Sequence, residues 1–313
     1  VCSSDLKNMN NLKKIGLTAL AASLVTTSAF AGEMSVAGSA SIGVKNTTGT
    51  NTALGKSWTM GNQLTFTGGG ELDNGMNVSL SFIIDQADDS TTGLANSPFD
   101  SHSVTISSDA LGSFKFSGEG GSSAQGAMDA GAAGDLWNNG TGVAEITGAA
   151  AGNNSMFYTL PSMVDGLEVT ASMSPGKAAQ ETHTSYGVAY TGVEGLTVKF
   201  GQGDSGAPGA EIESTTMMAS YAIGSFTVSA SNTEADKTGA NNREVRSYQV
   251  AYTLSDSMSA TYGTETYETV GSSTDEEIDS LGVSYTTGGM TLSANTFDTE
   301  GAGNTAGAKT ERW

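Results

Sequence analysis

Apolar and polar residues alternate one by one along most of the sequence after residue 32. In 196–201 the even positions hold Leu, Val and Phe, and the odd positions hold Thr, Lys and Gly. The segments 78–84 and 247–254 have the same character. A period of two predicts β-strands with one apolar and one polar face, because successive side chains of a strand point to opposite sides. No segment after residue 32 shows a convincing helical period, and we therefore expect an all-β protein.

The breaks between these segments alternate between short turns and longer polar loops. The short turns, such as 73–75 and 287–289, contain the Gly, Asn and Asp residues that tight hairpins favour. An antiparallel meander of this kind has its short turns at one end (the short-turn end) and its long loops at the other (the loop end). We predict fifteen strands, near 34–44, 58–71, 76–86, 101–108, 113–118, 155–160, 167–173, 184–191, 196–203, 214–222, 226–234, 245–254, 258–268, 277–286 and 290–298. Longer loops are expected at 45–57, 87–100, 119–153, 174–183, 204–213, 235–244, 269–276 and from 299.

Five of the nine tyrosines recur at intervals of 31–33 residues, each at the end of a strand before a short turn and on its apolar face. Tyrosine favours the boundary between lipid and water, so such a ring is typical of a membrane barrel. A soluble all-β repeat is the alternative, but it gives no reason for the ring. We therefore predict a transmembrane antiparallel β-barrel whose polar faces line a water-filled lumen. The predicted aromatic girdle consists of Tyr158, Tyr190, Tyr221, Tyr252 and Tyr285.

Composition removes several other classes of protein. Lys and Arg number 13 against 33 Asp and Glu, and this net charge of −20 argues against a nucleic-acid binder. The sequence holds no run of about 18 apolar residues, which excludes a helical membrane protein. Hydrophobic residues make up 37%, which suits either a disordered acidic chain or a β-protein with sparse alternation. The periodicity favours the second.

The first 31 residues have the character of a secretory signal peptide. Lys13 and Lys14 precede an apolar stretch, 15–25, and the segment 28–31 (Ser-Ala-Phe-Ala) is typical of a cleavage site. We expect cleavage after Ala31, so that 1–31 comprises a non-native extension plus the signal peptide and 32–313 forms the barrel. An uncleaved N-terminal anchor is the alternative. Export to the cell outer membrane through the periplasm follows from this interpretation.

Four short motifs then follow one another at particular spacings: Gly70–Met76, Val104–Ser107 with Leu111–Phe116, Asn153–Tyr158 and Asp165–Val169. Each is weak alone, but together they resemble the general diffusion porins of Gram-negative bacteria, especially those of alphaproteobacteria. The resemblance covers nearly all of 32–300. It implies a sixteen-stranded outer-membrane barrel, usually a homotrimer, with the third loop folded into the pore. Outer-membrane lipid and lipopolysaccharide would then surround the protein.

The family pattern leaves one strand unaccounted for. Bacterial single-chain barrels have even strand numbers, whereas we predict fifteen strands. The segment 308–313 shows no amphipathic strand, so we expect a fragment that lacks the sixteenth, closing strand. The alternative is that one of the short candidates, 113–118 or 155–160, is not a strand.

The longest loop, 119–153, contains acids and no Lys or Arg. The resemblance places it inside the barrel as the constriction, and an extracellular loop is the alternative. Charges of opposite sign on the wall would create a field across the pore that selects solutes by charge. The predicted constriction residues are Glu119, Asp129, Asp135 and Glu145. The predicted lumen-wall residues are Lys115, Lys199, Glu71, Asp85 and Glu168, and plain solvated side chains are the alternative for the two lysines.

We expect a passive channel for small hydrophilic solutes and ions, with a weak preference for cations. A non-conducting surface β-barrel or adhesin-like structural protein is the alternative. His102 and His183 are the only histidines, and a catalytic Ser-His-Asp arrangement could be written only by chance. We expect no enzyme activity, no cofactor and no metal site. The acidic groups at 88–89 and 275–277 could bind Ca²⁺, but solvated loop charge is the simpler interpretation.

Overall fold

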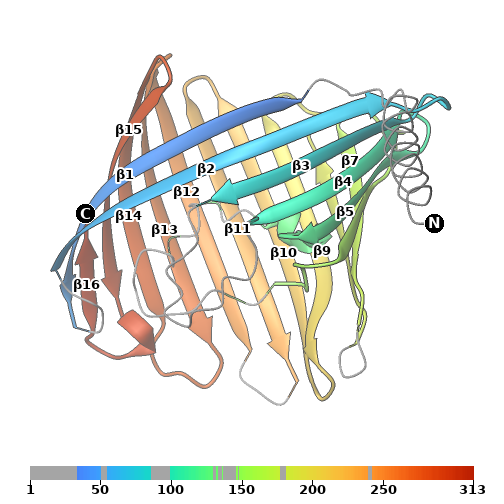
Figure 1. The fold of residues 1–313 in the computed structure, drawn as a ribbon. Helices are drawn as coiled ribbons and strands as arrows, with labels where there is room; N and C mark the ends of the chain where they lie inside the picture. The colour runs from blue at the N-terminus through green and yellow to red at the C-terminus, as the bar shows by residue number, and fades with distance from the viewer. Residues whose placement is uncertain are drawn as a thin grey trace, which may run out of the picture.

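The computed structural model describes residues 34–50, 55–85, 99–129, 132, 136, 146, 148–176, 181–238 and 242–313. Within these ranges sixteen strands form one closed antiparallel barrel, in which neighbours in sequence pair and β16 pairs with β1 (Figure 1). The strands are β1 (Ser35–Gly49), β2 (Gly55–Glu71), β3 (Asn77–Asp85), β4 (Ser101–Ser108), β5 (Gly112–Glu119), β6 (Ser155–Thr159), β7 (Leu167–Ser174), β8 (His183–Tyr190), β9 (Leu196–Ala207), β10 (Ala210–Ile223), β11 (Phe226–Lys237), β12 (Arg243–Ser255), β13 (Met258–Thr269), β14 (Glu276–Thr287), β15 (Met290–Glu300) and β16 (Lys309–Arg312). The described helices are α2 (Ala124–Met128) and the 3₁₀ turn η2 (Ala302–Asn304). The predicted signal peptide at 1–31 lies outside the described residues.

The predicted antiparallel β-barrel is confirmed, and each of the fifteen predicted strands corresponds to one strand of the structure. The short turns gather at one rim and the longer connections at the other (Figure 1). Strands β3–β8 have 5–9 residues, whereas β9–β15 have 11–14, so the wall is lower on one side of the barrel than on the other. In the described part of the chain, no helix has the length and apolar character needed to cross a bilayer.

The expectation that the sixteenth strand is missing was wrong. The segment 309–312 forms β16, which pairs with β15 from Phe297 to Glu300 and with β1 at 47–49. Both short candidates, 113–118 and 155–160, contain strands. The sequence pattern could not reveal β16, because its four residues (Lys-Thr-Glu-Arg) offer no apolar face. A strand this short closes the barrel only at the loop end.

Two predicted loops are shorter than expected. The predicted loop 204–213 is mostly strand, since β9 reaches Ala207 and β10 begins at Ala210. Likewise β1 extends to Gly49 and β2 begins at Gly55, within the predicted loop 45–57. The apolar alternation ends before these strands do. Backbone hydrogen bonds between the two strands are enough to extend a hairpin into water, so a strand can continue where both of its faces are polar.

The two faces of the wall differ in what covers them. On the outer face, Val228 and Val250 are paired and remain 47% and 42% exposed. On the inner face, Thr216 and Ser247 are fully buried. The buried apolar contacts lie on the inner face as well, where Leu136 packs with Tyr267 and Ile278, and Ile146 packs with Ile212 and Ala235. The core therefore forms between the segment 119–153 and the inner wall.

Candidate functional site

The segment after β5 turns inward at once. Gly121 and Gly152 form an antiparallel bridge that holds the two ends of the segment together. Helix α2 follows, and the Ser123 side chain caps it by accepting a hydrogen bond of 2.9 Å from the Gly126 amide. The helix contacts β7, β8, β9 and β10. The described part of the segment therefore starts inside the barrel, against its inner wall.

Buried hydroxyl groups of the wall hold the first turn of α2. The Ala124 amide donates to the hydroxyls of Ser172 and Ser185, each at 2.9 Å. These two hydroxyls are themselves 2.6 Å apart. Because Ser172 stands on β7 and Ser185 on β8, the N-terminus of the helix is fixed to two strands at once.

Gln125 is fully buried and connects three parts of the site. Its Nε2 donates to Thr216 Oγ1 on β10 at 2.7 Å. Its Oε1 accepts from the Ala149 amide at 2.9 Å, and Ala149 belongs to the returning end of the segment. One side chain therefore joins the helix, the wall and the returning chain.

Two positions of the wall under α2 are glycines, beside the serines and the threonine that hold the helix. A Cβ at Gly187 would lie 2.7 Å from the Ala124 carbonyl oxygen, and one at Gly201 would lie 2.8 Å from Gln125 Cα. These distances are shorter than real carbon contacts allow. Glycine at both positions therefore lets the helix backbone approach the strands closely.

Beyond the helix, the described residues follow the wall toward β14. Asp129 Oδ1 accepts from Thr233 Oγ1 on β11 at 2.8 Å, and the Ala132 amide donates to Ser231 Oγ on the same strand at 2.8 Å. The Leu136 amide donates to Glu265 Oε2 on β13 at 3.2 Å, and Tyr267 donates to the other carboxylate oxygen of Glu265. The described residues of the segment thus contact the inner wall on strands from β7 to β14.

The predicted constriction residues have different positions. Asp129 is hydrogen-bonded to the wall, as described above. Glu119 ends β5, where its Oε2 lies 3.8 Å from His102 Nδ1. Asp135 and Glu145 lie outside the described residues. The structure therefore places one of the four acids against the wall and one at the rim.

The strand register places all five predicted wall residues on the inner face. Lys199 stands two positions from Gly201, which faces α2, and Lys115 stands two positions from Ser117, which is buried beside Gly121. Lys199 and Glu168 both pair with Ala189, and the remaining pairs are Glu71 with Asn77 and Asp85 with Gln63. Because β9 is one of the strands that α2 contacts, Lys199 lies on the same side of the lumen as the helix.

Four cationic residues of the inner face were missed at the sequence level, and one of them, Lys237, pairs with the inward-facing Ile212. Phe297 packs against the Leu136 cluster, and Arg312 pairs with Phe297 on one side and with Thr47 on the other. Lys45, two positions from Thr47, therefore faces the lumen as well. Arg243 faces inward with Val245, which packs against both apolar clusters. The apolar and polar alternation of β1 continues through Lys45. The inward position of Lys45 could therefore have been predicted from the odd-numbered positions of that strand.

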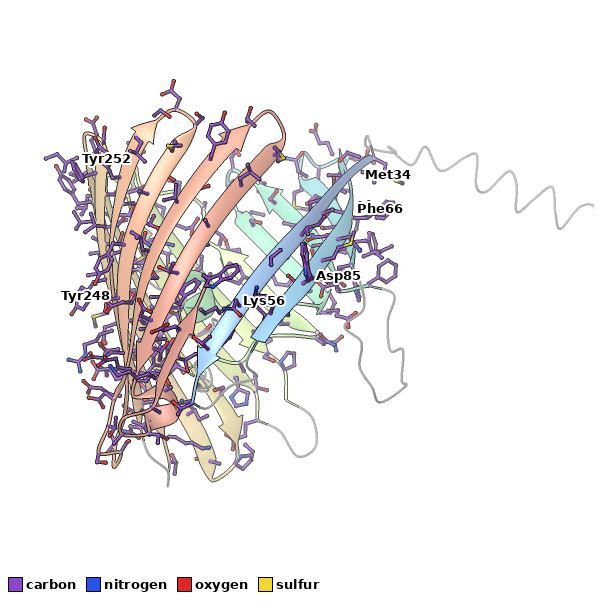
Figure 2. The ribbon with its side chains drawn as sticks, turned by 90° about the vertical axis from the view of Figure 1, so that its left-hand side faces the viewer. Met34, Lys56, Phe66, Asp85, Tyr248 and Tyr252 are labelled. Atoms are coloured by element: carbon purple, nitrogen blue, oxygen red, sulfur yellow. The ribbon has the colours of Figure 1, made fainter. Side chains whose placement is uncertain are left out.

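The five predicted girdle tyrosines all stand on the outer face. Tyr158 pairs with Phe114, Tyr190 with Val198, Tyr221 with Val228, Tyr252 with Phe226 and Tyr285 with Leu292. Figure 2 shows Tyr252 near the short-turn rim, with Tyr248 lower on the same outer surface. The outer wall therefore carries one tyrosine on each of five strands at the same end.

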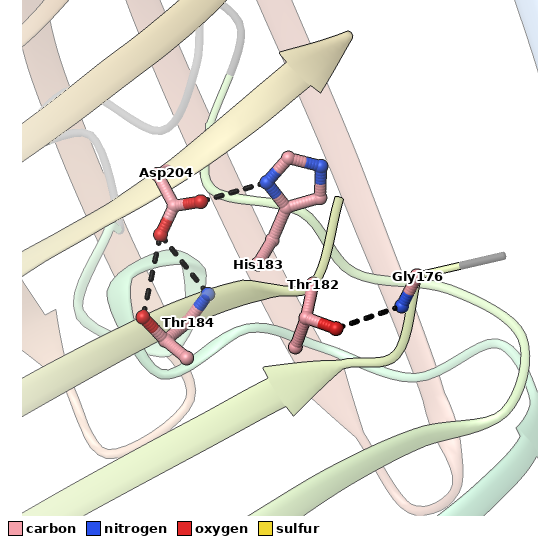
Figure 3. Close-up of polar contacts among 5 residues, drawn as sticks. All are labelled: Gly176, Thr182, His183, Thr184 and Asp204. Atoms are coloured by element: carbon pink, nitrogen blue, oxygen red, sulfur yellow. Dashed lines mark hydrogen bonds and ion pairs between the residues drawn. The ribbon is translucent and has the colours of Figure 1, made fainter. Parts of the chain in front are cut away.

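His183 takes part in a structural contact at the loop end (Figure 3). Its Nδ1 lies 2.7 Å from Asp204 Oδ2, and the other oxygen of Asp204 accepts from the Thr184 amide at 3.0 Å. The Asp204 carbonyl also accepts from the Ala150 amide at 2.9 Å. Within the described ranges, the His183 ring bonds only to this carboxylate, so the contact fixes β8, β9 and the returning segment to one another. Among the same residues, no three His, Cys, Asp or Glu side chains converge as a metal site would require.

Comparison with known proteins gives a family and a fold. The sequence model of the Gram-negative porin family matches residues 16–291. No curated protein matches the sequence. Among solved structures, the anion-selective porin from Comamonas acidovorans has a TM-score of 0.64 at 14% identity, with 90% of this chain and 97% of that chain covered. A loop-deletion mutant of OmpT, an outer membrane protein of Vibrio cholerae, has a TM-score of 0.65 at 17% identity, with coverages of 90% and 97%. A mutant of the Rh. blastica porin has a TM-score of 0.63 at 12% identity, with coverages of 90% and 98%.

At these identities the solved structures show the shared fold, whereas the family match spans most of the chain. The sixteen-stranded barrel, the polar inner face and the inward-folded third loop are consistent with that match. The chain belongs to the Gram-negative porin family and is an outer-membrane porin.

Proposed function

We propose that the chain forms a water-filled channel through which small hydrophilic solutes and ions diffuse without a chemical step. The observation that supports this proposal is that described residues of the segment 119–153 lie inside the barrel and are held to its wall by buried hydrogen bonds. We propose that the segment narrows the pore and leaves a passage for water. We propose neither catalysis nor a cofactor.

The charges around the lumen support a weak preference for cations. Glu71, Asp85 and Glu168 face the lumen, and the segment 119–153 adds Glu119, Asp129, Asp135 and Glu145. Six cationic residues oppose them on the inner face: Lys45, Lys115, Lys199, Lys237, Arg243 and Arg312. Because the two sets are nearly balanced, we expect modest selectivity.

Deletion of residues 125–150 tests the channel and its constriction together. The full chain, reconstituted in planar bilayers, should give stable single-channel currents, and the deletion should raise the conductance because the narrowing segment is removed. A KCl gradient across the bilayer should give a small reversal potential of the sign expected for cations. A folded barrel without ion current would favour the non-conducting alternative, and unchanged conductance after the deletion would place the segment outside the pore.

Two further properties are proposed from family membership. We infer a homotrimer in contact with outer-membrane lipid and lipopolysaccharide, and removal of residues 1–31 on export. Cross-linking of the unheated protein should yield a species of three chains, and the mature N-terminus should be Gly32. The mobility of Arg246, which is paired on the outer face with Glu244 at 3.5 Å and with Glu268, would report on contact with lipid phosphates.

A further inference from the structure

A lysine and a phenylalanine stand side by side on the inner wall, where β5 and β6 meet. Lys115 of β5 pairs with Phe157 of β6. Two positions nearer the loop end, Ser117 and Ser155 are each 3% exposed, because Gly121 of the segment 119–153 lies against both. Residues two positions apart on a strand share a face. Lys115 and Phe157 therefore both face the lumen.

This pair forms the first accessible row beside the start of the segment 119–153. Lys115 is exposed and Phe157 is half-buried, whereas the neighbouring row toward the loop end is covered. On its other side Phe157 pairs with Ser172, whose hydroxyl accepts from the Ala124 amide at 2.9 Å. The ring therefore lies beside the point where α2 is anchored. Part of an aromatic surface is exposed in a polar lumen, where covering it is favourable.

The positions around the pair carry hydroxyl groups rather than acids. Lys115 pairs on its other side with Thr105. The next row toward the short-turn end holds Ser113, which pairs with Thr159. The ion pairs of the described chain do not include Lys115. Within the described residues, Lys115 therefore presents its charge to the lumen.

Lys199, the other predicted wall lysine, has a different setting. Its paired neighbours are Ala189 on β8 and Met218 on β10. Of the two predicted wall lysines, Lys115 is the one that pairs with an aromatic residue. A comparison of the two lysines therefore separates the effect of lumen charge from the effect of charge beside a ring.

Two interactions are available at this site, and they lie within reach of one small molecule. An ammonium group binds a carboxylate through a charge-assisted hydrogen bond. A phenyl ring binds another aromatic ring in an offset or edge-on arrangement, with the ring centroids about 4.5–7 Å apart. Paired residues of neighbouring strands have Cβ atoms about 4.5–5.5 Å apart, so Lys115 Nζ and the Phe157 ring can contact the same solute. A molecule whose carboxylate is attached directly to an aromatic ring engages both groups.

We propose that Lys115 and Phe157 form a binding site for small aromatic carboxylates, of which benzoate is the simplest. The inference rests on the proposed channel, because the solute reaches the site through the lumen. Lys115 holds the carboxylate, and the ring of the solute covers the exposed part of Phe157. Acetate engages the lysine alone, and toluene engages the phenylalanine alone. The site therefore favours one class of anion in a channel whose proposed overall preference is for cations.

Fluorine NMR with 4-fluorobenzoate measures this binding directly. The full chain is refolded in detergent micelles and titrated, and the signal change in empty micelles is subtracted. The site variants are Lys115→Gln and Phe157→Leu. The matched controls are Lys199→Gln, which removes a lumen lysine without an aromatic neighbour, and Phe116→Leu, which changes an outward-facing phenylalanine of β5. The electrophoretic mobility of the unheated protein shows whether each variant has refolded.

We expect the dissociation constant of 4-fluorobenzoate to rise about three- to tenfold in each site variant, because each variant loses one of the two contacts. Each control should change it by less than about twofold. On the unchanged chain, benzoate should displace 4-fluorobenzoate at least about threefold more effectively than cyclohexanecarboxylate, which has the same charge but no aromatic face. This competition decides the matter if a variant does not refold.

Several results would overturn the proposal. They are the lack of saturable binding by the unchanged chain, unchanged binding in either site variant, equal loss in Lys115→Gln and Lys199→Gln, and equal competition by the two acids. Binding is measured without any current. A chain that conducts ions but does not bind 4-fluorobenzoate would therefore overturn this inference and leave the proposed channel standing, and a chain that binds it but carries no current would overturn the channel alone.

Discussion

At the scale of single residues, the inner wall depends on a few polar groups that cannot be exchanged for apolar ones. Gln125 satisfies a hydroxyl of the wall and an amide of the returning segment, and all three groups are buried. Burying a donor or acceptor without a partner costs more than one hydrogen bond contributes, so each of these groups depends on the others.

Gln125→Leu should release the returning end of the segment. The change leaves the Ala149 amide without its partner, and one such buried group costs about 1–3 kcal/mol, whereas Thr216 Oγ1 keeps its contact with Thr233 Oγ1 at 3.0 Å. We expect larger current fluctuations and a lower midpoint of urea unfolding in lipid vesicles. The matched control is Gln249→Leu, on the inner face of β12. If both variants behave like the unchanged protein, the interpretation of Gln125 is wrong.

Gly201→Ala should destabilise the barrel and displace α2. A Cβ at this position would lie 2.8 Å from Gln125 Cα, and such overpacking costs about 1–3 kcal/mol. Gly68→Ala on β2 is the control, because its Cβ would meet nothing within 4 Å. Urea unfolding of both variants in vesicles measures the difference. Equal midpoints would show that the helix does not approach the wall as closely as described.

Lys45→Glu should shift the reversal potential toward stronger cation preference, because it changes the charge of the inner face by two units. The control is Lys56→Glu, which makes the same charge change on the outer face of β2 (Figure 2). Lys56 pairs with Asn46, and this pair lies on the same face of the wall as the outward-facing pair Val44–Trp58. The outer variant should leave the reversal potential unchanged. A shift of equal size in both would indicate a general surface effect rather than charge in the pore.

At the scale of elements, the alternation of apolar and polar residues could predict the strands but not the path of the long segment. A strand between lipid and water must alternate apolar and polar residues along its own sequence. Fifteen strands could therefore be predicted from that alternation. The anchors of the segment are single polar side chains whose partners lie 91 and 129 positions away, at Thr216 from Gln125 and at Glu265 from Leu136. No local pattern contains such information, so only the family resemblance could place the segment inside the barrel.

Strand β16 is a second element that the local sequence pattern could not predict. Its four residues are mostly charged and carry no alternation of apolar residues, so their role depends on the edges they meet, at Thr47 and Phe297. The inner-face position of Arg312 could not be predicted without that pairing. The inner-face position of Lys45, in contrast, follows from the alternation of residues along β1 and was predictable.

Hydrogen exchange should differ sharply between elements. In the described chain, amides of residues 35–45 that point away from β2 and amides of residues 290–296 that point away from β14 have no strand partner. Strands β12 and β13 are paired on both sides. We expect the first group to exchange within the fastest class of strand amides and the amides of β12–β13 within the slowest. Mass spectrometry of the refolded protein measures both. Uniform protection around the barrel would contradict this difference in pairing.

At the scale of the whole molecule, the described residues of the segment 119–153 contact one run of strands. Helix α2 contacts β7, β8, β9 and β10, and Asp129, Ala132 and Leu136 are hydrogen-bonded to β11 and β13. The inward-facing Lys45 and Lys115 lie on β1 and β5, outside that run. A solute in transit should therefore meet two unlike sides of the lumen. Changes at Lys45 or Lys115 should alter which solutes the porin admits, whereas changes at Thr216 or Glu265 should alter how firmly the segment is held.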